Sequence, residues 1–512
     1  MMRFQKAAVA AVIAAGLALA GCGGGGGGNT GGAAKTAPSL VLGNIIPPQT
    51  FEARNLNWGN QSIYFQAVYD SLLKPSPNGK DVEANLATQW EYNADKTILT
   101  MKLREDVTFT DGTPFTAEVA AQNLLRFRDG TSPQRSKVVD MVNAAAKDKN
   151  TLEITLKQAN PAFLIYLAQA AGMQESPAAF SKSDVQTNPV GSGPYTLNTG
   201  STVVGTSYKF DKNPKYWNAD AVKYDSLTIN VYNDATSLLN ALRGKQLDAS
   251  AINDVSIIPQ VKAAGFTDNG SSLNFAGLML FDRAGQSNPA LGKVEVRQAI
   301  NYAVDRDAFL KAVGLGFGEV TGQVFREDSP AYDKSLNDKY KFDPAKAKDL
   351  LAKAGYPKGF ELTIPTAPGF PKQMWPLLQQ QLSDVGIKVS YVDVGQNIIP
   401  DLQSKKYGVS YFTLQRDANE WQLISNLLAP TATWNTFKYQ DPKVDALIGK
   451  IRTAEGADRD AALKELNQYV VDQAWFAPWY TPTNFFVTNA KTKVELNQGN
   501  AWPNLWNITP KA

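Results

Sequence analysis

A single cysteine near the start of the 512-residue sequence is the first residue whose chemistry can be assigned. Cys22 directly follows Leu19-Ala20-Gly21, which looks like the lipobox at which bacterial lipoprotein precursors are cleaved before the thiol is diacylated. The alternative is an ordinary signal peptide with a cysteine nearby. Two acyl chains anchor a protein durably to a membrane, whereas one chain binds only marginally. An exported protein with one cysteine has no internal disulfide, so its core alone must stabilise it.

Histidine does not occur in the sequence, and its absence removes much of the usual catalytic chemistry. A Ser-His-Asp triad, a Cys-His dyad and histidine-ligated zinc, nickel or haem sites are excluded. No G-x-x-x-x-G-K-[ST] loop is present either, so the chain does not use ATP itself. The 48 Asp and Glu residues leave a glycosidase-like carboxylate pair open as a minor alternative. We therefore expect a protein that is not an enzyme and needs no cofactor.

The first 38 residues are typical of an export signal followed by a tether. Residues 1–21 place Arg3 and Lys6 before a short apolar run, as in a secretory signal peptide. Residues 22–38 are rich in glycine and small polar residues, which bury too little surface to fold. A formal net charge of +3 implies neither nucleic acid nor an acidic surface as partner.

The remaining sequence alternates between strand and helix periodicity. Strands are predicted at 97–103 and 151–156, and helices at 118–127, 296–313 and 345–354. The last of these helices begins at Asp343-Pro344 and ends at Gly355, which are typical start and stop residues. A strand at 360–364, a helix at 374–382 and a strand at 387–392 follow. This order predicts a mixed α/β fold.

Several short motifs occur in a fixed order along the chain. They are Val68–Leu73, Leu86–Glu91, Lys102-Leu103-Arg104, Val107–Glu118, Gly191–Tyr195, Asn213–Trp217, Val296–Ile300, Asp305-Arg306 and Ala352–Tyr356. In this order they resemble the family 5 extracellular solute-binding proteins of ABC importers, a group that includes oligopeptide- and dipeptide-binding lipoproteins. The second and fourth motifs are similar to the family signature, with Glu118 where aspartate is commoner.

The resemblance implies a periplasmic-binding-protein-like α/β fold with two hinged lobes and an extra inserted subdomain. Lobe I would combine residues 39–55, 186–272 and 483–512. Residues 56–185 would form the inserted subdomain of lobe I, and residues 273–482 would form lobe II. A solute, most simply a dipeptide or oligopeptide, would bind between the lobes of a monomer. The closed form would then dock on a membrane permease, outside the cytoplasm.

The resemblance also implies a role for Asp417. Peptide-binding members carry an aspartate in a motif similar to G-W-x-x-D-Y-x-x-P, which pairs with the α-ammonium group of the ligand. Asp417 falls on that aspartate, while Leu414 and Trp421 replace the tryptophan and proline. A desolvated carboxylate bound to an ammonium is a strong, oriented contact. The alternative is that Arg416 or another basic residue neutralises Asp417 as a structural pair.

The neighbouring Arg416 leaves a second possibility open. Adjacent side chains of an extended strand point to opposite faces, so Arg416 and Asp417 do not both enter one cleft directly. If Arg416 faces inward, the solute would carry a carboxylate or phosphate.

Further ligand contacts are expected from aromatic residues and from one strand. The aromatic candidates are Trp58, Trp421, Trp434 and Tyr439, for which packing in the core is the alternative. Asn274 begins a segment to 282 that would offer backbone groups to an extended ligand, as an added strand does. Nickel complexes, haem, opines or oligosaccharides in the same fold, or a receptor that signals rather than imports, stay open.

Overall fold

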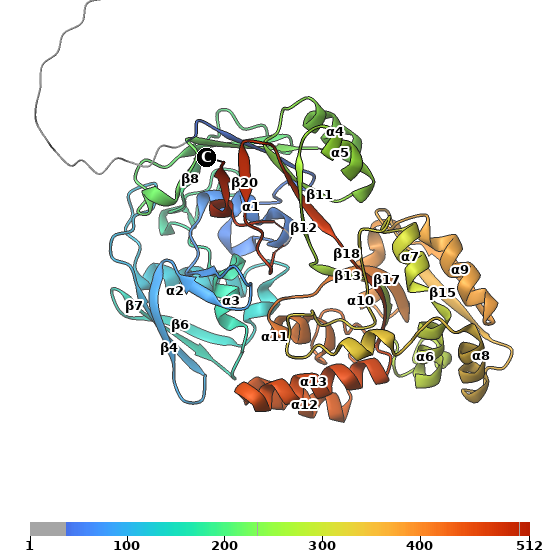
Figure 1. Ribbon diagram of the computed structural model, residues 1–512. Coiled ribbons are helices and arrows are strands. Elements are labelled where there is room, and N and C mark those ends of the chain that lie inside the picture. The colour runs from blue at the N-terminus through green and yellow to red at the C-terminus, as the bar shows by residue number, and fades with distance from the viewer. Residues whose placement is uncertain (1–36, 233, 501, 512) are drawn as a thin grey trace, which may run out of the picture. The chain divides into compact units, whose positions relative to one another are not determined.

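The computed structural model describes residues 37–232, 234–500 and 502–511 (Figure 1). The predicted signal peptide, the predicted lipid-attachment residue Cys22 and nearly all of the predicted tether lie outside the described residues. None of the helices within these ranges combines the length and apolar character needed to cross a bilayer.

A seven-stranded mixed sheet forms the first part of the fold, in the order β12-β19-β11-β1-β10-β9-β8. Its strands are β1 (Leu40–Asn44), β8 (Tyr195–Leu197), β9 (Ser207–Lys212), β10 (Ser226–Val231), β11 (Ala249–Ile252), β12 (Thr267–Ser271) and β19 (Asn484–Thr488). The short strand β1 pairs in parallel with β10 and β11, and the other pairs are antiparallel. Helices α4 (Ala235–Arg243) and α5 (Ile258–Ala263) contribute apolar side chains to a core shared with β19.

A four-stranded sheet in the order β14-β18-β13-β17 forms the second part. Its strands are β13 (Asn274–Leu280), β14 (Gly318–Val320), β17 (Val409–Gln415) and β18 (Phe476–Pro482). Beside it lie the parallel strands β15 (Phe360–Thr366) and β16 (Ile387–Asp393), joined through α9 (Met374–Asp384). The helices of the region are α6 (Val294–Ala303), α7 (Arg306–Ala312), α8 (Pro344–Lys353), α10 (Ile398–Gln403), α11 (Glu420–Leu423), α12 (Pro442–Thr453) and α13 (Gly456–Asp472).

Two strand pairs carry the chain from one sheet to the other. Only Ser272 and Leu273 separate β12 from β13, and only Thr483 separates β18 from β19. Because β12 pairs with β19 and β13 pairs with β18, the two connections run side by side in opposite directions. Bending of one sheet against the other would concentrate at these three residues, where the ladder is interrupted. That the two parts move as hinged lobes stays a prediction.

A third sheet, β4-β5-β7-β6, lies within residues 87–156. Its strands are β4 (Ala87–Tyr92), β5 (Ile98–Leu103), β6 (Met141–Asp148) and β7 (Thr151–Leu156), and α1 (Ser62–Val68), α2 (Ala117–Asp129) and α3 (Phe163–Leu167) are the helices nearby in sequence. Two further short strand pairings are β2 (Leu73–Pro75) with β3 (Val82–Ala84) and β20 (Thr492–Val494) with β21 (Ile508–Pro510), besides isolated bridges.

The family signature near residue 111 forms a turn followed by a capped helix. Gly112 has a φ of +87°, which a residue with a side chain rarely adopts. The Asp111 carboxylate accepts from the Thr113 amide at 2.9 Å, and the Thr116 hydroxyl accepts from the first turn of α2. The signature therefore specifies local backbone geometry here.

The helix predictions had mixed outcomes. The helix at 345–354 is confirmed as α8, because the Asp343 carboxylate accepts from the Lys346 amide and Gly355 has a φ of +91°. The single helix predicted at 296–313 is wrong. It is split into α6 and α7 at Val304, which is extended, and the Asp305 carboxylate caps α7 by accepting from the Ala308 amide. Aspartate favours such a cap over a helix interior because its carboxylate competes for backbone amides.

Candidate ligand-binding site

Asp417 lies two residues beyond the end of β17, where the chain leaves the four-stranded sheet. Its side chain is partly buried. The Gln415 amide donates to Asp417 Oδ1 at 3.0 Å and to the Gly499 carbonyl oxygen at 3.2 Å. Within the described ranges no other group donates a hydrogen bond to this carboxylate. The remaining lone pairs of Asp417 are therefore free to accept from a ligand.

Lys137 brings a positive charge to the same place from a distant part of the sequence. It belongs to a short 3-10 helix, Arg135–Val138. Its ammonium group lies 3.5 Å from the Gln169 side-chain oxygen and 5.4 Å from the centre of the Tyr166 ring. The Tyr166 hydroxyl is in turn 3.4 Å from the Ser425 hydroxyl. This chain of contacts joins the 137–169 region to the segment that follows Asp417.

The two charges influence each other without forming a contact pair. Burial raises the pKa of Asp417 to about 6, and the nearby charges of Lys137 and Arg326 oppose that rise. Burial lowers the pKa of Lys137, and the charge of Asp417 opposes that fall. Among the described residues no ion pair within 4.0 Å includes either group. Asp417 and Lys137 are therefore close enough for their charges to act on each other, without an ion-pair contact.

Arg326 is neutralised locally and contributes to the site only at longer range. Its Nε atom lies 2.9 Å from Asp328 Oδ1, and one terminal nitrogen donates to the Gln498 carbonyl oxygen at 2.8 Å. These bonds fix the 326–328 segment against the C-terminal segment. Of the three charged groups Asp417, Lys137 and Arg326, only Arg326 has an ion-pair partner in the described chain.

Arg416 faces away from Asp417, as the alternation of side chains predicts. Its guanidinium donates to the Ser272 hydroxyl at 3.1 Å, next to the connection between β12 and β13. Burial lowers its pKa to about 10, with a further lowering by Arg326 and an opposing effect from Glu327. In the described structure no ion pair joins Arg416 to Asp417, so the proposed structural pairing of these two residues is not seen.

The four aromatic candidates are packed among protein side chains. Trp421 is buried beneath the Arg452 guanidinium, which lies 4.8 Å from its ring centre. Trp434 packs against Phe412 at 4.5 Å. The other two are also accounted for by packing: Tyr439 lies edge-on to Trp475, and Trp58 is buried in the main core. A contact of any of the four with a ligand stays a prediction.

The prediction that a ligand adds as a strand along 274–282 is wrong for most of that segment. Strand β13 is a central strand, paired with β17 along its whole length and with β18 from Ala276 to Met279. Its backbone groups are therefore already used by the sheet. The Asn274 amide donates to the Asn484 side-chain oxygen at 3.3 Å, which links the two connections between the sheets.

A groove of about 750 Å³ is lined by Asn419 and Glu420 but not by Asp417 or Lys137. One wall comes from residues 80–165, including Trp90, and the other from residues 419–459, including Asn419. Side chains bridge it: Lys96 pairs with Glu455, and Arg452 donates to the Ala159 carbonyl oxygen at 3.3 Å. Its size is in the range of small-molecule sites. Sequence reasoning did not find this groove, because its walls are about 300 residues apart.

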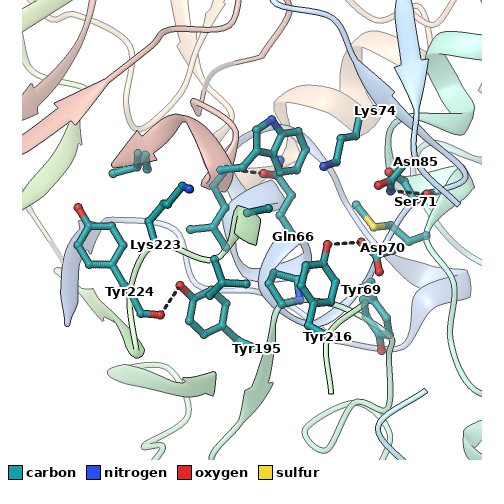
Figure 2. Close-up of a pocket in the computed structure, with 17 residues that line it drawn as sticks. Gln66, Tyr69, Asp70, Ser71, Lys74, Asn85, Tyr195, Tyr216, Lys223 and Tyr224 are labelled. Carbon is teal, nitrogen blue, oxygen red and sulfur yellow. Dashed lines mark hydrogen bonds between the residues drawn. The ribbon is translucent and has the colours of Figure 1, made fainter. Parts of the chain in front are cut away.

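A second, much narrower cavity of about 30 Å³ lies among residues 66–224 and 505–508 (Figure 2). Beside it, the buried Asp70 carboxylate accepts from the Tyr216 hydroxyl and the Trp217 indole at 2.9 Å and from the Ser192 hydroxyl at 3.1 Å. Such a volume holds one or two water molecules. The motif residues at 192 and 216–217 thus hold this part of the fold together through the Asp70 carboxylate.

The comparisons with known proteins agree with this architecture. The model of the bacterial extracellular solute-binding proteins, family 5 Middle, matches residues 81–442. The glutathione-binding protein GsiB of Escherichia coli O6:K15:H31 is 31% identical over 417 residues, which cover 77% of this chain and 79% of that protein.

Solved structures have the same fold. Helicobacter pylori DppA in complex with the peptide STSA has a TM-score of 0.79 at 20% identity and covers 93% of this chain and 99% of its own. NikA from Brucella suis in complex with Fe(III)-EDTA has a TM-score of 0.79 at 23% identity, covering 93% and 100%. The predicted fold class is confirmed. The chain belongs to the family 5 extracellular solute-binding proteins, which deliver solutes to the permeases of ABC transporters.

Proposed function

We propose that this protein captures short peptides outside the cytoplasm and delivers them to an ABC importer. The observation that carries the proposal is the partly buried Asp417 carboxylate, which has one hydrogen-bond donor in the described chain. A peptide's α-ammonium group supplies three donors and the opposite charge. A contact of this kind is strong where water is excluded, and it recognises a group that peptides share.

The two connections between the sheets supply the mechanism of capture. A ligand held by Asp417 on one side and by the 137–169 region on the other contacts both parts only when they are close. Ligand then favours the closed form, because only that form makes both sets of contacts. The permease would recognise this closed form.

The named ligand of one relative identifies a peptide worth testing. The relative from Escherichia coli is a glutathione-binding protein, and glutathione is a tripeptide with a free ammonium group. Glutathione and the dipeptide Ala-Phe are therefore the first two ligands to measure by calorimetry.

The test replaces Asp417 and compares a free with a blocked ammonium. Asp417→Ala is expected to weaken binding of Ala-Phe by about 2–5 kcal/mol, because the ammonium is buried without its partner. N-acetyl-Ala-Phe should bind wild type and variant almost equally. Asp349→Ala, which removes an exposed aspartate of α8, is the matched control. An equal loss for both peptides would rule out the role given to Asp417.

Native mass spectrometry of the protein as purified distinguishes a receptor from a hydrolase. A receptor retains an intact ligand, one per chain, whereas a carboxylate-dependent hydrolase releases products on incubation with peptides or oligosaccharides. A retained mass that belongs to a metal chelate or a sugar would replace the peptide proposal with another solute.

We also propose that diacylated Cys22 anchors the protein to the bacterial membrane. The support is the sequence Leu19-Ala20-Gly21-Cys22 after an apolar run. Cys22→Ser should abolish labelling by radioactive palmitate and move the protein out of the membrane fraction. Labelling that persists in the variant would contradict lipid attachment at this residue.

A further inference from the structure

The groove of about 750 Å³ contains a cation that the described chain leaves without an anion. Arg452 belongs to α12, is partly buried and lines one wall of the groove. Among the described residues no carboxylate lies within 4.0 Å of its guanidinium. An arginine that is partly removed from water is normally paired, because an unpaired charge is costly to desolvate. Arg452 therefore has open capacity to bind an anion that enters the groove.

Each of the other three basic residues that line the groove has a carboxylate in contact. The pairs are Lys96 with Glu455, Arg459 with Glu420 at 3.1 Å and Lys80 with Asp328 at 3.3 Å. Asp81, an acidic lining residue, is exposed and accepts from the Asn78 amide at 3.1 Å, so water and salt screen its charge. The unmatched contact charge of the groove is therefore the guanidinium of Arg452.

Two contacts hold the Arg452 side chain in place without neutralising it. The guanidinium lies 4.8 Å from the centre of the Trp421 ring and donates to the Ala159 carbonyl oxygen at 3.3 Å. Stacking on an aromatic face leaves the N–H edge of a planar guanidinium available, and that edge suits a carboxylate. Because Ala159 lies in the opposite wall, the guanidinium is held between the two walls of the groove.

Asp140 acts on Arg452 through its charge but is already occupied by other groups. Burial lowers the pKa of Arg452, and the charge of Asp140 opposes that fall. The Asp140 carboxylate accepts from the Gln158 and Asn160 amides at 2.8 and 3.3 Å and lies 3.7 Å from the Lys157 ammonium. Asp140 is thus bound within its own segment and does not fill the place of a contact partner for Arg452.

The wall opposite Arg452 offers apolar and aromatic surface. Trp90 and Tyr92 lie two residues apart on the edge strand β4, so their side chains point to the same face. Leu164 of α3 lines the same wall, and all three side chains are partly buried against the main core. Covering the apolar area that they still expose would favour an occupant with an apolar body. The volume of the groove suits a small molecule.

We propose that this groove is a second ligand site, which takes small molecules that join a carboxylate to an apolar body. Arg452 binds the carboxylate, while Trp90, Tyr92 and Leu164 cover the apolar part. Neither Asp417 nor Lys137 lines the groove, so the site goes beyond peptide capture and does not depend on it. An uncharged analogue binds more weakly, because it leaves the guanidinium unpaired.

The test compares an acid with its neutral analogue. Hydrocinnamate and hydrocinnamamide share one apolar body and differ in charge. In a ligand-observed NMR titration, wild type should bind the acid with a Kd of about 1 mM or tighter. It should prefer the acid over the amide by about tenfold, the value of a charge-assisted contact. Arg452→Met keeps an unbranched side chain and should reduce this preference to less than about twofold.

Three further variants separate binding from a structural effect. Lys450→Met removes an exposed lysine of α12 that does not line the groove, and it should leave the preference unchanged. Arg452→Lys should keep part of the preference, because the charge remains while the planar fork is lost. Trp90→Ala should weaken both probes by about 3- to 10-fold, since part of the apolar wall is removed. This last variant keeps the proposal testable where Arg452→Met does not fold.

The outcomes distinguish this site from the proposed function. The second site is overturned if wild type binds neither probe at about 5 mM, if Arg452→Met keeps the wild-type preference, or if Trp90→Ala binds both probes as wild type does. Each of these results leaves peptide capture at Asp417 standing. A wild type that binds hydrocinnamate as expected but neither Ala-Phe nor glutathione would contradict the proposed function and support the second site.

Discussion

Asp70 and Asp417 are two desolvated aspartates with opposite surroundings. Asp70 is buried and accepts from three side chains, the Tyr216 hydroxyl, the Trp217 indole and the Ser192 hydroxyl. Asp417 is partly buried and accepts from Gln415 alone within the described chain. Burial raises the pKa of both carboxyls.

The difference separates an aspartate that holds the fold together from one that is available to a ligand. Protein folding satisfies buried polar groups wherever it can, because each unsatisfied group costs free energy. Asp70 follows this rule and belongs to a network that joins residues 70, 192 and 216–217. Asp417 accepts one hydrogen bond from the described chain and is partly exposed, so its other lone pairs are open to solvent or to a ligand.

The largest expected effect is the loss of stability on removing Asp70. Asp70→Ala leaves three donors without an acceptor and opens a small cavity, so the free energy of unfolding should fall by about 3–5 kcal/mol. Asp417→Ala should change it by less than about 1 kcal/mol, because one hydrogen bond is lost while a desolvated charge is removed. Urea denaturation of both variants measures the difference. A larger loss for Asp417→Ala would reverse the comparison.

The pH dependence of binding should be the next largest effect. Asp417 has a pKa of about 6 in the ligand-free protein, and only its ionised form pairs with an ammonium. The affinity for Ala-Phe should therefore fall as pH drops below 6, by up to tenfold per pH unit. Asp417→Asn should bind weakly and lose this dependence, as calorimetry between pH 5 and 8 would show. A fall that persists in the variant would locate the titration at another group.

Protonation of Asp417 should weaken ligand binding but stabilise the ligand-free protein. Its pKa near 6 in the folded protein exceeds the value of about 4 expected for an unfolded chain. The folded state therefore binds more protons between these values, so Asp417 makes the ligand-free protein more stable as pH falls from 6 towards 4. The difference in urea midpoint between wild type and Asp417→Asn should shrink over this interval. An unchanged difference would contradict the raised pKa.

The smallest effect is expected at the exposed bridge across the groove. Lys96 pairs with Glu455, but their side chains are 40% and 75% exposed, and such surface pairs contribute little. Lys96→Ala should change the affinity for Ala-Phe by less than about 1 kcal/mol, and 0.5 M salt should abolish the change. A loss as large as that of Asp417→Ala would show that this bridge controls closure.

Local features were the part of the fold that could be predicted well. The cap at Asp343, the left-handed Gly355 and the turn at Gly112 depend on backbone preferences that act over a few residues. The break between α6 and α7 was missed, although Asp305 is a good capping residue, because apolar spacing continues across it.

The predictions for the site also divide into those that depend on nearby residues and those that depend on how distant segments pack. Asp417 was found through the motif around it, and the opposite orientation of Arg416 followed from strand alternation. The burial of Trp58 and Trp421 could not be predicted, because an aromatic side chain fits a core and a cleft equally well. The strand-addition role was wrong for most of 274–282, because the central position of β13 depends on which strands pair with it.

The sequence by itself determined the α/β class and the family. It excluded chemistry that depends on histidine, and it identified Cys22 as a candidate for lipid attachment and Asp417 as a candidate for ligand binding. These depend on composition, on short motifs and on their order. Only the tertiary structure decided that the charge of Lys137, 280 positions earlier, acts on Asp417. It also decided that Arg416 donates to Ser272, and that Asp70 accepts from three side chains while Asp417 accepts from one. The physical reason is that charge pairing and desolvation depend on distance in space, which packing of remote segments sets and local spacing does not record.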